Sequence, residues 1–146
     1  MRELLYLKDE QLKQFIEKIF IGYQASFSDA KRTLENHSIG IAHHKVIHLI
    51  SSYKGITISG LLKKLKVTKQ SLNRVLRDLI KSKMIKQIKD ENDTRKKNLF
   101  LEKDGKKFFD VIYNSQKRRI FNALKNSEPD SVVKFKKVLE RIIDGK

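Results

Sequence analysis

A short run of residues after Thr68 combines amide, hydroxyl and cationic side chains on one face of a predicted helix. Its members are Lys69, Gln70, Ser71, Asn73, Arg74 and Arg77. Side-chain amides can bind adenine edges, guanidinium groups can bind guanine, and ammonium groups suit phosphates. A helix face that only contacted solvent would more often alternate Glu with Lys. Gln70 and Asn73 therefore favour recognition of double-stranded DNA, with a solvated basic face as the alternative.

The neighbouring residues predict the elements that present this face. Apolar residues recur at helical spacing on its opposite side, at Leu72, Val75, Leu76 and Leu79. Thr68 is a suitable N-cap, because its hydroxyl can accept a backbone N–H one turn on. A shorter helix precedes it, with a turn at 65–67. Lys66 and Lys83 follow the two predicted helix ends, where a left-handed conformation would cost each about 1 kcal/mol.

A basic hairpin is predicted after these two helices. Residues 84–89 and 97–101 read as strands, with Leu99 and Leu101 inward and Asn98 and Phe100 outward. The turn between them is rich in Asp and Asn and carries Arg95 and Lys96. A cation here suits the narrow minor groove of A·T tracts. A solvated polar hairpin is the alternative. Ile56, Thr57 and Ile58 are expected to add a short third strand.

Several of these motifs resemble those of a known family. The run Asp93-Thr94-Arg95, followed by Leu99, Leu101 and residues 103–106, is similar to the wing signature of MarR-type bacterial transcription regulators. Residues 56–79 resemble the helix-turn-helix of that family, and residues 67–72 are most like a PetP-like branch. Two positions depart from the pattern. Gly60 replaces a Glu, so Thr57 lacks a capping-box partner, and Glu102 replaces a Thr.

The resemblance implies a fold class and a domain organisation. The fold is expected to be mainly α with a small β-wing: a winged helix-turn-helix with N- and C-terminal dimerisation helices. Residues 1–146 would form a single domain, with dimerisation helices over 8–34 and 104–146. The DNA-binding lobe would span residues 39–102.

The apolar patterning of the two chain ends also predicts a homodimer. Residues 8–34 read as one long amphipathic helix, and a second long helix is expected over 104–126. Ser127 and Pro129 suit the start of a last helix with a strong apolar stripe. One chain of this size has little left to cover these stripes, so their mutual burial in a two-fold dimer is expected.

Composition limits the classes of function. The net charge of +16 favours a polyanionic partner, with an acidic membrane surface as the competitor. The sequence has no apolar run long enough for a membrane span and no signal peptide, so a cytoplasmic location is expected. The absence of Cys excludes disulfides and a thiolate sensor. The six scattered Gly form no phosphate-binding loop, and no catalytic motif is found, so neither an enzyme nor a cofactor is expected.

Three histidines lie on a helix predicted over residues 39–51, which Ser38 would cap. His44 and His48 are four residues apart, but further metal ligands are lacking nearby, so no metal site is expected. Members of the resembled family commonly bind small aromatic anions near this helix. Tyr23, Arg32 and His44 are the candidates for such a ligand site.

The expected function is therefore a homodimeric, sequence-specific regulator of transcription on a pseudo-palindromic operator. The helix from Thr68 to Lys81, with Thr68 itself among the DNA-binding residues, would read the major groove. Gln70, Asn73 and Arg74 would read bases, while Lys69, Ser71 and Arg77 would lie nearer phosphates. Arg95 would enter the minor groove. A small ligand would shift the dimer between two states. Two alternatives remain open: a non-specific nucleoid protein of the same charge, and a winged-helix adaptor for RNA or protein.

Overall fold

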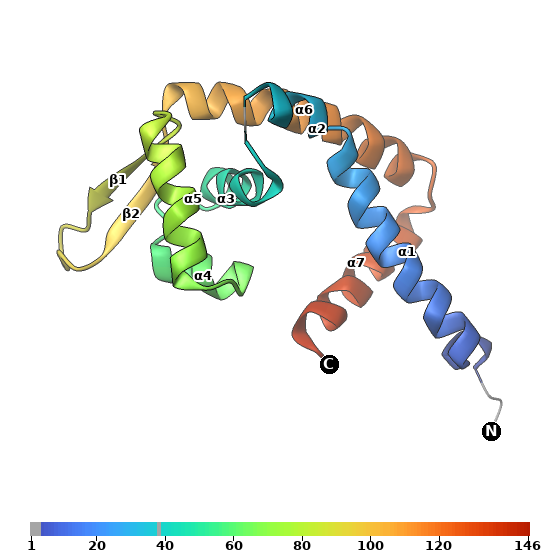
Figure 1. The fold of residues 1–146 in the computed structure, drawn as a ribbon. Coiled ribbons are helices and arrows are strands. Elements are labelled where there is room, and N and C mark those ends of the chain that lie inside the picture. The colour runs from blue at the N-terminus through green and yellow to red at the C-terminus, as the bar shows by residue number, and fades with distance from the viewer. Residues whose placement is uncertain (1–3, 38) are drawn as a thin grey trace. The chain divides into compact units, whose positions relative to one another are not determined.

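The computed structural model describes residues 4–37 and 39–146, which form helices and one two-stranded sheet (Figure 1). The chain divides into two compact units. The first, here called the lobe, comprises residues 30–113. The second, here called the terminal unit, comprises the residues up to 29 together with 114–146.

In its described residues, the lobe contains four complete helices, the sheet and the start of a fifth helix. Its elements in order are α2 (Lys31–Asn36), α3 (Ile41–Ser52), α4 (Ile58–Leu65), α5 (Lys69–Lys81), β1 (Ile85–Lys89), β2 (Lys97–Leu101) and the first turns of α6 (Lys103–Lys125). Leu72, Val75, Leu76 and Leu79 of α5 are all buried, as the helical spacing predicted. They pack in one core with apolar residues of α3, α4, both strands and α6.

Two threonines cap the helices of the helix-turn-helix. The Thr57 hydroxyl accepts the backbone N–H of Gly60 at 3.1 Å, so α4 is capped even without a capping-box glutamate. The Thr68 hydroxyl accepts the N–H of Ser71 at 3.1 Å at the start of α5. Lys66 and Lys83 are left-handed, with φ of 53° and 58°, so the turn is formed despite the strain that the sequence predicted.

The wing is an antiparallel hairpin, in which Ile85 faces Leu101 and Lys89 faces Lys97. Leu99 is fully buried, as expected, while Asn98, Phe100 and Leu101 are half-buried. The expected third strand is wrong. Thr57 and Asn98 form only an isolated bridge, because Thr57 already serves as the N-cap of α4.

The terminal unit contains α1 (Asp9–Ser28), preceded by the 3-10 turn η1 (Leu5–Leu7), the later part of α6, and α7 (Pro129–Asp144). Gln116 of α6 donates to the carbonyl of Ser26 at 3.0 Å. Arg119 binds Asp29 through two nitrogens, at 2.6 and 3.1 Å. Within the described ranges, no residue of α1 or α7 is buried.

Two predictions at helix ends are wrong. The long helix over residues 8–34 is interrupted, because α1 ends at Ser28 and α2 begins at Lys31. The apolar spacing continues through the break, but Ala30 and Leu34 are buried in the lobe core whereas the stripe of α1 is exposed. Ser127 does not cap α7. Its hydroxyl donates back to the carbonyl of Ala123 at 2.8 Å, and Glu128 is the N-cap.

The other helix boundaries lie within two residues of the predicted ones. The helix α6 starts and ends one residue earlier than expected, and α3 begins at Ile41. The proposed cap Ser38 lies outside the described residues, and Gly40 is the N-cap of α3. Among the described residues, no helix is both long and apolar enough to cross a membrane.

Candidate nucleic-acid interface

A groove separates the exposed face of α5 from the wing. Its volume is about 630 Å³. The lining residues are Ile58 of α4, Lys69, Gln70, Asn73, Leu76 and Arg77 of α5, and Gln87 and Lys97 of the wing. Four of the residues predicted to contact DNA therefore share one concave surface with two wing side chains. Ser71 and Arg74 are exposed on α5 and lie outside this lining.

Gln87 and Lys97 were not among the predicted site residues. Lys97 lies directly opposite Lys89 in the hairpin, and like charges in facing positions destabilise a sheet. An anionic partner removes that cost. Period-two alternation from the buried Ile85 places Gln87 on the same face of β1, so strand register was the available signal.

Two hydroxyls at the start of α5 bind each other. The Thr68 hydroxyl accepts the Ser71 N–H and donates to the Ser71 hydroxyl at 2.8 Å. Thr68 and Ser71 thereby define where α5 begins, and Lys69 and Gln70 lie in the first turn that they cap. The observed contacts of Thr68 are thus those of an N-cap, and its role in DNA binding stays a prediction.

A hydrogen bond between α3 and α5 helps to fix the position of α5 in the lobe. His43 of α3 lies 2.9 Å from the carboxylate of Asp78, measured from Nε2. The helix α5 also buries Val75 and Leu79 in the core. Polar and apolar contacts thus hold α5 along its length, which limits how far its exposed residues can move.

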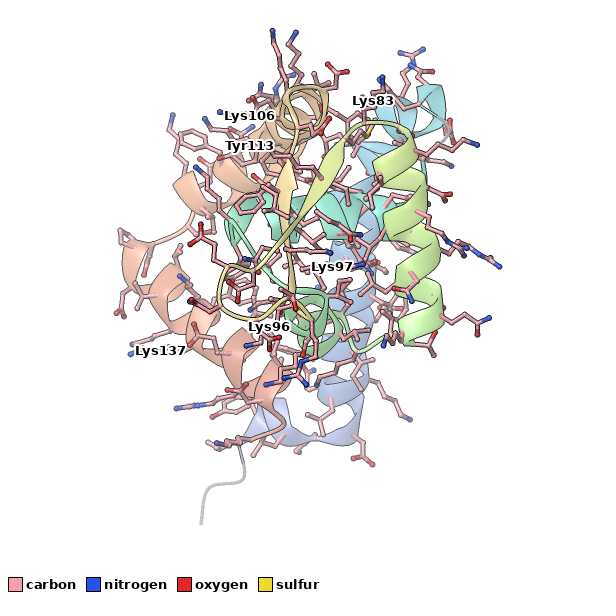
Figure 2. All side chains as sticks on the ribbon, turned by 90° about the vertical axis from the view of Figure 1, so that its left-hand side faces the viewer. Lys83, Lys96, Lys97, Lys106, Tyr113 and Lys137 are labelled. Carbon is pink, nitrogen blue, oxygen red and sulfur yellow. The ribbon has the colours of Figure 1, made fainter. Side chains whose placement is uncertain are left out.

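The wing tip is closed by hydrogen bonds around Asp93. Its carboxylate accepts the backbone N–H of Arg95 at 3.0 Å and lies 3.3 Å from the Arg95 Nε. The Lys96 N–H donates to the Asp93 carbonyl, and the Asp90 N–H to the Lys96 carbonyl. The Arg95 side chain is 91% exposed. Lys96 and Lys97 extend from the same hairpin (Figure 2).

The lobe carries most of the positive charge. Residues 30–113 contain twenty Lys and Arg against eight Asp and Glu, a net charge of +12 out of +16. A field of this size attracts polyanions and accelerates their association. The charge belongs to the unit that holds the groove and the wing.

The three candidates for a small-ligand site belong to different units. Tyr23 lies on α1 in the terminal unit, while Arg32 on α2 and His44 on α3 belong to the lobe. Arg32 is exposed, and His44 is almost fully buried. Burial, with a smaller effect from the charge of His48, lowers the pKa of His44 to about 4. Their joint role in ligand binding stays a prediction.

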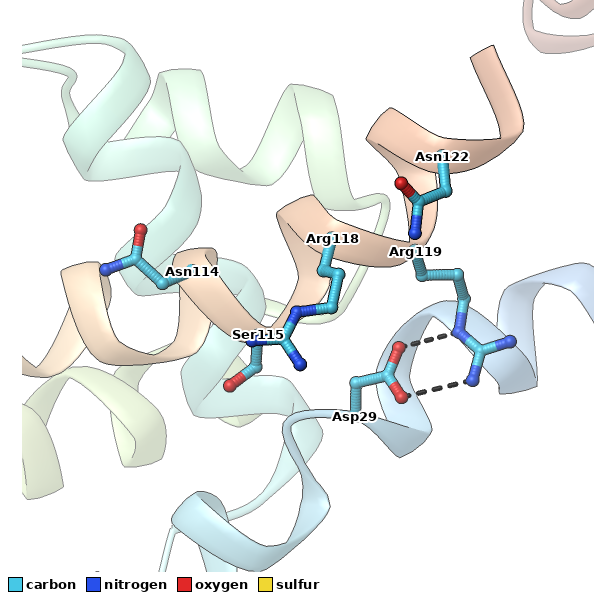
Figure 3. Close-up of a pocket in the computed structure, with 6 residues that line it drawn as sticks. All are labelled: Asp29, Asn114, Ser115, Arg118, Arg119 and Asn122. Carbon is cyan, nitrogen blue, oxygen red and sulfur yellow. Dashed lines mark hydrogen bonds and ion pairs between the residues drawn. The ribbon is translucent and has the colours of Figure 1, made fainter. Parts of the chain in front are cut away.

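The terminal unit has a polar cavity of its own, of about 620 Å³ (Figure 3). It is lined by Asn114, Ser115, Arg118, Arg119 and Asn122 of α6 and by Asp29. The Arg119 guanidinium lowers the pKa of the Asp29 carboxyl by hydrogen bonding. This ion pair joins the segment after α1 to α6. Among the described residues, no group of three or more His, Asp or Glu could hold a metal ion.

Helix, turn and helix followed by a basic hairpin define a winged helix-turn-helix protein. The sequence profile of the MarR family matches residues 37–96. The HTH-type transcriptional regulator PetP of Rhodobacter capsulatus is 38% identical over 141 residues, which cover 97% of this chain and 85% of PetP. The chain therefore belongs to the MarR family of transcription regulators.

Solved structures show the same fold at low sequence identity. NadR in complex with 4-hydroxyphenylacetate matches with a TM-score of 0.77 at 17% identity, over 97% of each chain. A MarR-family regulator from Silicibacter pomeroyi matches with a TM-score of 0.76 at 16% identity, over 99% of this chain and 96% of that one. A mutant of S. aureus MepR bound to an oligodeoxyribonucleotide matches with a TM-score of 0.61 at 19% identity, over 90% and 96%.

Proposed function

We propose that this MarR-family regulator binds a pseudo-palindromic DNA operator as a homodimer, in the cytoplasm. The observation that carries the proposal is the groove between α5 and the wing, where three amides and three cations converge. Amides discriminate bases and cations neutralise phosphates, so one surface combines specificity with affinity.

The proposed roles follow from position along α5 and the wing. Gln70 and Asn73 lie in the groove and read base edges, with Arg74 as a third reader on the exposed face. Lys69, Ser71 and Arg77 contact phosphates, together with Lys96 and Lys97. Arg95, at the exposed tip, enters the minor groove. Thr68 positions the start of the recognition helix.

Homodimerisation is supported by the uncovered apolar faces of the terminal unit. Large apolar side chains remain exposed on α1 and α7, among them Phe15, Phe20, Val133, Phe135 and Ile142. Patches of this kind mark interaction sites. A two-fold dimer presents two identical recognition helices, so half-sites about 10 bp apart are expected.

Modulation by a small aromatic ligand is part of the proposal. The related fold of NadR was solved with 4-hydroxyphenylacetate, an aromatic carboxylate. In this chain Tyr23, Arg32 and His44 are the proposed contacts. Such a ligand acts by preferring one of two dimer states, which alters the fraction competent for DNA.

Titration on operator and scrambled duplexes at several salt concentrations tests the assignment. The operator is first obtained by selecting bound fragments from genomic DNA. Asn73→Ala is expected to weaken operator binding by about 1–3 kcal/mol and to leave the salt dependence unchanged. Lys69→Ala is expected to weaken both duplexes and to reduce the salt slope by about one. Lys137→Ala, an exposed change on α7, is the control.

Three outcomes would contradict the proposal. Equal weakening of operator and scrambled DNA by Asn73→Ala would show that this residue does not read bases. Selection that returns no preferred sequence would favour a non-specific architectural protein. Tighter binding to structured RNA than to any duplex would favour an adaptor instead.

A further inference from the structure

A second cavity of the lobe lies where α5 ends and β1 is about to begin. Its volume is about 380 Å³, within the range of roughly 300–1,000 Å³ typical of small-molecule sites. Three segments far apart in sequence meet there: the end of α2, the turn after α5 and the first turns of α6. The cavity shares no lining residue with the groove that we assign to DNA.

The lining combines an apolar surface with two opposite charges. Met84, Phe108 and Val111 supply the apolar part. His37, Ser82, Asp104 and Lys107 supply the polar part. Asp104 and Lys107 are three residues apart on α6, so their side chains emerge on one face of the helix. Neither residue belongs to the ion pairs found in the described part of the chain.

Hydrogen bonds within the lobe define which donor and acceptor groups of His37 and Ser82 remain for a ligand. His37 Nδ1 lies 2.9 Å from the Thr33 carbonyl, which can only accept, so Nδ1 carries a hydrogen. A neutral His37 then presents Nε2 as an acceptor. The His37 ring meets Phe108 edge-on, with centroids 4.8 Å apart. The Ser82 hydroxyl donates to the Asp78 carbonyl at 2.9 Å, so only its lone pairs remain.

We propose that this cavity binds a free α-amino acid with an apolar or aromatic side chain. The ammonium group would meet Asp104 and the remaining acceptors of His37 and Ser82. The carboxylate would meet Lys107, and the side chain would cover Met84, Phe108 and Val111. A plain carboxylate satisfies only Lys107 and brings a second negative charge beside Asp104, so a zwitterion fits the lining better.

The turn that lines the cavity connects the two elements proposed to contact DNA. Ser82, Lys83 and Met84 donate their N–H groups to carbonyls of Asp78, Ile80 and Leu79. Lys83 is left-handed, and a Cβ on Gly105 would overlap with the Met84 carbonyl oxygen. A ligand here therefore touches a strained, tightly packed connection between α5 and β1. Its effect on DNA rests on the function proposed above.

Calorimetric titration of the full chain without DNA tests the site itself. The probes are L-phenylalanine, phenylacetate, which lacks the ammonium group, and phenethylamine, which lacks the carboxylate. L-Phenylalanine is expected to bind at least tenfold more tightly than either. Asp104→Asn and Lys107→Gln should each weaken it at least tenfold. Asp110→Asn and Lys106→Gln, neighbours on α6 that do not line the cavity, should leave it unchanged.

Titration of operator DNA with and without saturating L-phenylalanine tests the regulation. We expect at least a fivefold change in DNA affinity, and linkage requires that DNA change the affinity for L-phenylalanine by the same factor. Absence of L-phenylalanine binding, equal binding of phenylacetate, or indifference to Asp104→Asn would overturn the site. Ligand binding with unchanged DNA affinity would overturn the regulation. If no duplex binds specifically, the proposed function fails, while the calorimetry still judges the cavity independently.

Discussion

Arg95 at the wing tip is tied to Asp93 but remains open to solvent. An ion pair this exposed contributes little to stability, so its main effect is to orient the guanidinium. Arg95→Ala is expected to weaken binding to most duplexes, and most strongly where A·T tracts narrow the minor groove. Fluorescence anisotropy with A·T- and G·C-flanked operators measures the difference.

Asp93→Asn provides the matched comparison for Arg95→Ala. The amide keeps an oxygen that can accept the Arg95 N–H but loses the charge that orients the guanidinium. Asp93→Asn should weaken DNA binding less than Arg95→Ala does. The loss should again be larger for operators with A·T flanks than for those with G·C flanks. Equal losses on both kinds of flank for Arg95→Ala would mean that Arg95 contacts phosphate rather than the narrow groove.

His44 makes the stability of the fold sensitive to acid. Its pKa falls from 6.5 to about 4 in the folded chain, chiefly through burial. Between these values the unfolded chain holds the proton and the folded chain does not, so stability is present above pH 6.5 and is lost as the pH falls through this window. Because screening reduces the effect, we expect a loss of about 1–2 kcal/mol.

Urea unfolding at neutral and mildly acidic pH measures this loss. In His44→Gln the free energy of unfolding should differ less between the two pH values than in the wild type, by about the expected loss. This holds whatever the variant does to stability at neutral pH. His48→Gln should keep most of the difference, because burial contributes more than the neighbouring charge. The same acid dependence in His44→Gln as in the wild type would assign it to other groups.

At the scale of elements, two glycines in helices have opposite roles. Gly105 lies in the first turn of α6, where a Cβ would overlap with the Met84 carbonyl oxygen. Gly22 lies within α1, where an added Cβ would meet no atom within 4 Å. Gly105→Ala should destabilise by about 1–3 kcal/mol through forced backbone shifts. Gly22→Ala should stabilise α1 by about 1 kcal/mol, because Ala has a higher helix propensity than Gly.

Thermal and urea unfolding of the two variants tests this contrast. The same substitution is made in a helix in both cases, so propensity alone would stabilise both. A neutral or stabilising Gly105→Ala would show that the connection between α5, β1 and α6 can move apart. That result would also weaken the proposed transmission of ligand binding through the Met84 turn.

The predictions from sequence were correct where the local pattern of apolar and capping residues is compatible with a single structure. The spacing of Leu72, Val75, Leu76 and Leu79 and the cap at Thr68 predicted α5 closely, since periodicity and capping agree. The break at residues 29–30 was missed because apolar spacing is the same on both sides, although the residues belong to different units. Such a break depends on long-range packing, which the spacing of apolar residues along the sequence does not reveal.

The candidate site was predicted in part for the same reason. The face of α5 follows from its own helical period, so Lys69, Gln70, Asn73 and Arg77 could be named together. The contribution of Gln87 and Lys97 depends on the tertiary placement of the wing beside α5. The pairing of His43 with Asp78 joins residues that are 35 positions apart, and no local pattern predicts it.

At the scale of the whole molecule, charge and apolar surface are distributed differently. The lobe holds +12 of the net charge. The helices α1 and α7 expose their apolar stripes, with Ile143 at 71% and Val133 at 55% exposure. A protein that binds DNA as a two-fold dimer needs both surfaces, one for the polyanion and one for its own copy.

Dimerisation through α7 is the prediction that links these surfaces. Light scattering at micromolar concentration should give twice the chain mass of 17.1 kDa. Leu139→Asp places a charge in the apolar stripe, so it should shift the mass towards one chain and greatly weaken binding to a two-half-site operator. Lys137→Asp introduces the same residue among the polar positions of α7 and should remain dimeric. A wild-type monomer would contradict the arrangement, and a dimeric Leu139→Asp would remove α7 from the interface and leave α1 to form it.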